Sequence, residues 1–148
     1  MKVLTVWHKL LIYFIRQKNE ILRNITGITY VSRDDIMELA TWSKTDVIKV
    51  LDNLSSEADI CNCPWCILYR DVKSKCKNCE YGKRNVWCES PDRMGNYRKI
   101  LTNLRERKII GETNPLTKQP EGLTNVRSIV ALTDNVKFTY RAMHYILV

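Results

Sequence analysis

The sequence lacks the marks of several protein classes. No stretch reaches the roughly 20 apolar residues that a membrane-spanning helix needs. The apolar first residues do not resemble a secretory signal peptide, because His8 and Lys9 interrupt them and no small-residue cleavage site follows. There is no phosphate-binding glycine loop, no nucleophile elbow, no paired-carboxylate motif, no internal repeat and no low-complexity tract. These absences predict a cytoplasmic protein that is not an enzyme and does not act at a membrane.

Acidic side chains are also in short supply. The chain of 148 residues carries 24 Lys and Arg against 16 Asp and Glu, a net charge of +8. Such an excess favours an acidic partner, most often nucleic acid and less often an anionic membrane surface, although a charge that only keeps the protein soluble is the simpler alternative. The apolar fraction of 45% is typical of one globular domain.

Cysteine, by contrast, is abundant and confined to one stretch. All 6 cysteines lie between Cys61 and Cys88. The two C-x-x-C pairs can hold one tetrahedral metal ion from two tight turns, so we predict a structural zinc module over residues 61–90. The expected ligands are Cys63, Cys66, Cys76 and Cys79, with Cys88 as the first substitute and Cys61 as the next.

Other uses of the cysteines stay open at this point. Disulfides would suit a secreted protein or one from a hyperthermophile, and four thiolates could also hold an iron–sulfur cluster. The run Cys63-Pro64-Trp65-Cys66 resembles a glutaredoxin-like dithiol, but that motif should follow a strand, and here a helix is expected before it. His8 and His144 lie far from the cysteines in sequence, which argues against a catalytic zinc.

Apolar periodicity predicts helices on both sides of the cysteines. Residues Val3–Ile25 repeat apolar side chains at helical spacing, and Gly27 is a suitable end. Ser32 and Ser43 are suitable N-caps for two shorter helices. Two further amphipathic helices are expected over Tyr97–Lys108 and Asp134–Val148.

The stretch from Ile36 to Leu54 resembles the helix-turn-helix of winged-helix DNA-binding proteins. An Ile on the first helix is followed by a compact turn, a Ser-x-x-x-Val run and Leu-x-x-Leu, the pattern made by Ile36, Ser43, Val47, Leu51 and Leu54. Trp42 departs from the family, which has a smaller aliphatic residue in the turn. The resemblance implies that the second helix enters a major groove.

The rest of that family's fold is a wing, and the sequence suggests one after the cysteines. Ile109–Glu112 and Val126–Leu132 are predicted as its two strands, with residues 113–125 as the loop between them. The expected fold is therefore mainly α (α+β): one winged-helix domain over residues 1–148, with a small two-stranded wing and a zinc-stabilised insertion.

The resemblance implies sequence-specific binding of double-stranded DNA, most simply by a transcriptional regulator. The residues expected at the DNA comprise the recognition helix, the wing and a second basic helix: Ser43, Lys44, Thr45, Lys49 and Asn53, then Lys118 and Arg127, then Arg98, Lys99, Arg105 and Arg107. Tyr97–Lys108 also resembles a recognition helix, but no equivalent of the Ile36 helix precedes it. The long first and last helices predict a homodimer.

Two other functions compete with DNA regulation. The cysteine module could be a zinc-dependent adaptor that binds another protein, because a helical fold does not fix a function. Alternatively, its basic residues and the aromatic side chains of Tyr69, Tyr81 and Trp87 could bind RNA or single strands without sequence preference.

Overall fold

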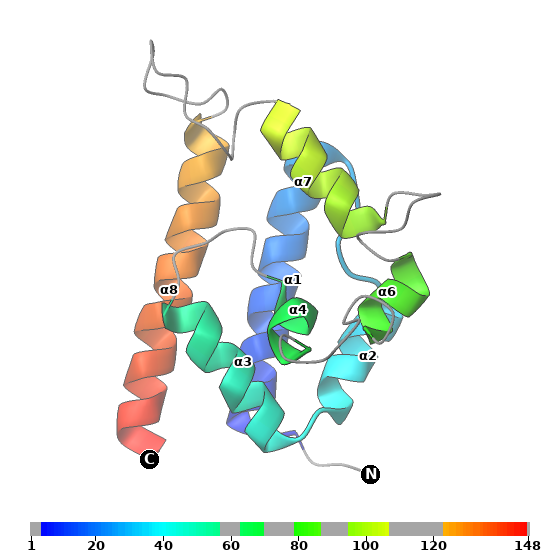
Figure 1. The fold of residues 1–148 in the computed structure, drawn as a ribbon. Coiled ribbons are helices and arrows are strands. Elements are labelled where there is room, and N and C mark those ends of the chain that lie inside the picture. The colour runs from blue at the N-terminus through cyan, green and yellow to red at the C-terminus, as the bar shows by residue number, and fades with distance from the viewer. Residues whose placement is uncertain (1–3, 57–62, 70–78, 87–94, 107–122, 148) are drawn as a thin grey trace.

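A computed structural model describes residues 4–56, 63–69, 79–86, 95–106 and 123–147, and these form a bundle of helices. Helix α1 (Val6–Thr26) packs against α8 (Leu123–Leu147), α3 (Lys44–Ser56), α2 (Arg33–Thr41) and α7 (Asn96–Glu106). The short helix α4 (Pro64–Leu68) lies in front of α1 in Figure 1 and packs against α3. The short helix α6 (Glu80–Asn85) lies beside α2.

Helix α1 forms the centre because its apolar side chains surround more than one side of it. Its N-cap is Thr5, whose side chain accepts the backbone N–H of His8, and its end is Gly27, at φ 74° in the left-handed region that glycine adopts without strain. The predicted helix and its predicted end are both confirmed. Nine of its residues are buried: Trp7, His8, Leu10, Leu11, Ile12, Phe14, Ile15, Leu22 and Ile25.

The link from α1 to α2 is held by a side chain rather than by a strand. Asn19 Oδ1 accepts the backbone N–H groups of Tyr30 and Val31 at 2.8 and 3.1 Å. Both residues are buried, so the amide of Asn19 satisfies backbone donors that would otherwise be lost from water. The link therefore places the Tyr30 ring inside the bundle.

An aromatic cluster joins α4, α6 and α7 to the link. Trp65 of α4 lies with its ring centroid 4.9 Å from that of Tyr81, and Tyr30 lies 5.6 Å from Tyr81 and 4.8 Å from Tyr97. All four side chains are buried. Ring contacts of this kind contribute about 0.5–1.5 kcal/mol each beyond burial, so the segments around the cysteines share one core with α1.

The predicted fold class is wrong, because the described residues contain helices and no strand. Val126–Leu132, predicted as the second strand of a wing, lies within the 25-residue helix α8, which also includes the last three residues of the predicted loop. The cause is packing: Leu132, Val136, Tyr140 and Met143 recur at helical spacing and contact the core. A two-stranded wing is therefore not part of the described fold.

Some sequence predictions fall where the structure gives no description. The first predicted wing strand, Ile109–Glu112, and most of the predicted loop lie outside the described residues. The predicted helix over Tyr97–Lys108 is confirmed as α7 up to Glu106. Among the helices that the structure describes, none is both long and apolar enough to cross a membrane.

Candidate functional site

The turn between α2 and α3 consists of Trp42 and Ser43, and contacts from three sides fix it. The Nε2 of His8 donates to the Trp42 carbonyl oxygen at 2.6 Å, and the Trp42 indole N–H donates to Glu38. The buried Trp42 ring stands edge-on to Trp65 at 5.7 Å between centroids. Ser43 Oγ accepts the backbone N–H three residues on, so the predicted N-cap is confirmed. The bulky turn residue therefore fits by being buried.

Helix α3 divides cleanly into a core face and an exposed face. Val47, Val50 and Leu51 are fully buried, whereas Lys44, Thr45 and Lys49 are exposed within its first two turns. Because residues four apart share one side of a helix, Thr45 and Lys49 point the same way. The beginning of α3 thus presents hydroxyl and ammonium groups to water while its other side is fixed in the bundle.

The end of this exposed face is held by hydrogen bonds within the protein. Asn53 donates its side-chain amide to the Lys49 carbonyl oxygen at 2.8 Å. The Tyr140 hydroxyl of α8 donates to Asp52 Oδ1 at 3.1 Å. Burial, the bond to Asp52 and the charge of Asp52 together raise the pKa of Tyr140 to about 12, so this link between α3 and α8 persists through neutral pH.

The structure brings some of the predicted DNA-contacting residues together and separates others. Ser43, Lys44, Thr45, Lys49 and Asn53 share α3 and its cap. Arg98, Lys99 and Arg105 are exposed on α7, which lies at the other end of the bundle from the α2–α3 turn (Figure 1). Lys118 and Arg107 lie outside the described residues, and Arg127 belongs to helix α8 rather than to a wing strand.

Three of the predicted metal ligands lie at the starts of two short helices. Cys63 is the N-cap of α4, Cys66 lies within α4, and Cys79 is the N-cap of α6. Cys63 is buried, and Cys66 and Cys79 are partly buried. Burial raises the pKa of Cys63, but hydrogen bonds from Cys66 and Tyr30 and the charge of Lys18 outweigh it and lower the pKa to about 7.

The Cys79 thiol is influenced by the same surroundings. Burial raises the pKa of this thiol to about 11, the hydrogen bond from the Gly82 backbone opposes this, and the charge of Cys63 adds to the rise. The Tyr30 hydroxyl lies 3.1 Å from the Cys63 sulfur. Two helix starts and the α1–α2 link therefore converge on these thiols.

Soft thiol donors are the chemistry that zinc prefers, so the donor type fits the predicted metal. The described part of the chain nevertheless contains no group of three or more His, Cys, Asp and Glu side chains arranged to hold a metal ion. Cys61, Cys76 and Cys88 lie outside the described residues. The zinc site and its ligand set therefore remain predictions.

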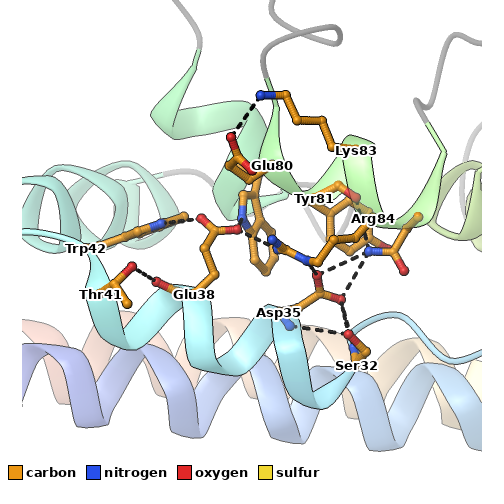
Figure 2. Close-up of polar contacts among 11 residues, drawn as sticks. Ser32, Asp35, Glu38, Thr41, Trp42, Glu80, Tyr81, Lys83 and Arg84 are labelled. Carbon is orange, nitrogen blue, oxygen red and sulfur yellow. Dashed lines mark hydrogen bonds and ion pairs between the residues drawn. The ribbon is translucent and has the colours of Figure 1, made fainter.

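Arg84 makes a polar junction between α6 and α2 that the sequence did not reveal. Its Nε donates to the fully buried Asp35 at 2.6 Å, and its Nη2 donates to Glu38 (Figure 2). Burial lowers the pKa of Arg84, but the bonds to Glu38 and Asp35 outweigh it and raise the pKa. The Trp65 indole N–H donates to Glu38 at 2.8 Å, and Asn85 donates to both oxygens of Asp35 at 3.2 Å.

The same junction continues into the aromatic cluster. The Tyr81 hydroxyl donates to the Tyr30 carbonyl oxygen at 2.5 Å, and the Lys18 ammonium lies 5.5 Å from the centre of the Tyr30 ring. Tyr81, an aromatic residue considered for base stacking, is buried instead. The cysteine-bearing helices are thus attached to α2 by hydrogen bonds from Arg84, Asn85 and Trp65, and to the core by edge-on and tilted aromatic rings.

No family model, curated protein or solved structure matches this chain. The arguments for its function therefore rest on the geometry of α2, α3 and the thiol-bearing helices.

Proposed function

We propose that the protein binds double-stranded DNA in a sequence-specific way, as a transcriptional regulator, with α3 as the recognition helix. The observation that carries this proposal is the exposed face of α3, where Lys44, Thr45 and Lys49 follow directly on a turn of two residues. A short turn that is anchored in the core holds the next helix at a defined angle, as entry into a major groove requires.

The charge balance supports nucleic acid as the partner. A net charge of +8 attracts phosphates at long range, and Lys44 and Lys49 are the positive charges on the exposed beginning of α3. Thr45 can donate to or accept from base edges.

We propose in addition that Cys63, Cys66 and Cys79, with Cys76 or another thiol of the chain, bind a structural zinc ion. The placement of these three cysteines at the starts of two neighbouring short helices supports this. A bound zinc ion would fix α4 and α6 to one another. The proposal also assigns the protein to the cytoplasm, where thiols stay reduced.

Duplex binding of a Lys44→Ala/Lys49→Ala variant tests the recognition helix. Loss of two phosphate-contacting lysines should weaken binding to all duplexes alike and reduce the slope of log affinity against log salt by about 2. Thr45→Ala should instead relax the preference for one base position, by about 1–3 kcal/mol. Duplexes selected from a random pool and read by fluorescence anisotropy supply the measurement.

Lys9→Ala/Arg16→Ala is the matched control, since it removes two exposed positive charges from α1. The salt slope of this control should differ less from that of the unchanged protein than the slope of the Lys44→Ala/Lys49→Ala variant does. An equal loss of duplex affinity in both variants would mean that general electrostatic attraction, and not α3, accounts for the binding. Preference for single-stranded oligonucleotides, or no nucleic-acid binding at all, would overturn the proposal in favour of a single-strand binder or a protein adaptor.

A further inference from the structure

Helix α8 carries an apolar strip on the side that faces water. Phe138, Tyr145 and Ile146 are 75%, 90% and 76% exposed, and Ala142 between them is exposed as well. Positions 138, 142, 145 and 146 fall on one side of a helix because they are separated by four, three and one residues. The opposite side of the same helix, with Val136 and Tyr140, is buried in the bundle.

The position of α8 leaves this strip open. Figure 1 shows α8 at the edge of the bundle, with α3 and α1 on its inner side. Large apolar side chains scattered singly on a surface need no explanation, but a continuous strip of them is typical of an interaction surface. Four neighbouring positions on one helix face, two of them aromatic, form such a strip.

Two charges beside the strip indicate what covers it. Asp134 and Arg141 are both exposed, and their separation of seven residues, two helical turns, puts them on the same flank of the strip. When two identical helices pair antiparallel, a given flank of one meets the same flank of the other. A twofold axis midway between the two charges, beside Phe138, therefore brings Asp134 of each helix to Arg141 of its partner.

We propose that two copies of this chain associate through α8, antiparallel about a twofold axis beside Phe138. The Phe138 rings then meet near the axis, and the oppositely charged flanks pair twice by symmetry. A second copy is the partner because the flanking charges are complementary to themselves in this register, in which Phe138 meets its own copy and Tyr145 and Ile146 lie against the first half of the partner's α8. The proposal goes beyond DNA binding and does not depend on it.

The sequence predicts a homodimer through the first and last helices, and this arrangement uses only the last of them. The buried side chains of α1 contact α8, α3, α2 and α7 of the same chain. Most of the apolar surface of α1 is therefore already used within the chain. The proposal accordingly assigns the contact between copies to α8.

Charge reversal tests the register. In sedimentation equilibrium of the full chain, Asp134→Arg and Arg141→Asp should each raise the dimer Kd by about tenfold, because each places like charges together at two symmetric positions. The double variant Asp134→Arg/Arg141→Asp should restore the original Kd, since opposite charges then face each other again with their signs exchanged. Both residues are exposed, and circular dichroism checks that every variant folds.

A second pair of variants tests the strip itself. Phe138→Ala should raise the dimer Kd by about tenfold or more, whereas Tyr13→Ala, which removes an exposed aromatic ring from α1, should leave it unchanged. A chain that is monomeric at all accessible concentrations overturns the proposal. So does a dimer that Tyr13→Ala weakens and Phe138→Ala does not, or one in which the charge-reversed double variant stays as weak as the single variants.

Discussion

Asp35 shows how one buried carboxylate can join parts of the chain that lie far apart in sequence. It caps its own helix by accepting the backbone N–H of Ser32 at 2.8 Å, and it also accepts from Arg84 and Asn85 of α6. A carboxylate withdrawn from water is stable only if such donors replace the lost hydration. Asp35 therefore orients the start of α2 and the end of α6 together.

Asp35→Asn should lower the free energy of unfolding by about 2–3 kcal/mol. The substitution keeps the shape of the side chain but removes the charge that pairs with Arg84, and it turns a new N–H₂ group toward existing donors. Glu38 remains as a second partner for Arg84, which limits the loss. Urea unfolding followed by circular dichroism measures the difference.

Glu80→Gln provides the control for that measurement. Glu80 pairs with Lys83 at 3.0 Å within the same short helix, and both side chains are about half exposed. An ion pair in water contributes little, so this variant should stay within about 0.5 kcal/mol of the unchanged protein. Equal losses of unfolding free energy in the two variants would show that burial does not make the Asp35 ion pair more stabilising than an exposed one.

Sequence reasoning at this scale succeeds where a residue acts on its near neighbours. Ser32, Ser43 and Gly27 cap or end helices within three or four residues of themselves, and all three predictions are confirmed. Arg84 could not be predicted in the same way, because its carboxylate partners are 46 and 49 residues earlier. Only the folded arrangement of α2 and α6 brings them together.

Among the helices, α8 shows why the predicted wing was wrong. Residues Val126–Leu132 contain β-branched side chains and follow a stretch with Pro115, Pro120 and Gly122, which together are typical of a strand after a hairpin loop. Short apolar runs do not distinguish strand from helix by themselves. The residues that follow pack against α1 and α3, and this packing favours a helix. A sequence pattern that is examined one segment at a time gives no information on such contacts between helices.

The contact between α3 and α8 includes a hydrogen bond whose pH dependence can be measured. Tyr140→Phe removes the donor to Asp52 and should lower the free energy of unfolding by about 1 kcal/mol at neutral pH. The pKa of Tyr140 is raised from 10.0 to about 12 in the folded protein. Its contribution is therefore complete below pH 10.0 and is lost as the pH rises through about 12.

The difference between unchanged and Tyr140→Phe protein should accordingly shrink as the pH is raised from 10.0 toward 12. Taking the difference at each pH cancels the ionisation of the other tyrosines. Urea unfolding at a series of pH values gives the curve. A difference that grows with pH in this range would mean that the Tyr140 hydroxyl does not donate to Asp52.

In the whole molecule, α4 packs against the proposed recognition helix, and α6 is joined to α2. Trp65 of α4 contacts the turn residue Trp42, and Trp65 and Arg84 both donate to Glu38 of α2. The turn that positions α3 is thus held from α1 by His8 and from α4 by Trp65. If α4 and α6 lost their ordered structure, the position of α3 would change through the contact between Trp65 and Trp42.

Removal of the proposed zinc ion should therefore weaken both stability and the proposed duplex binding. Cys63, Cys66 and Cys79 lie at the starts of α4 and α6, so a chelator that strips a zinc ion from them should lower Tm by more than about 5 °C. Duplex affinity should fall by about tenfold, because Trp65 then no longer supports Trp42 beneath α3. Differential scanning fluorimetry and anisotropy on the same samples, with metal content measured by elemental analysis, give both values.

Cys79→Ser separates this mechanism from a general effect of the chelator. The variant should already be metal-poor and less stable, and the chelator should change it no further, whereas readdition of zinc should rescue only the unchanged protein. A chelator effect that persists in Cys79→Ser would assign the metal to other ligands. If chelation lowers Tm but leaves duplex binding unchanged, the contact between Trp65 and Trp42 does not transmit the state of the thiols to α3, and the cysteine-bearing helices serve stability alone.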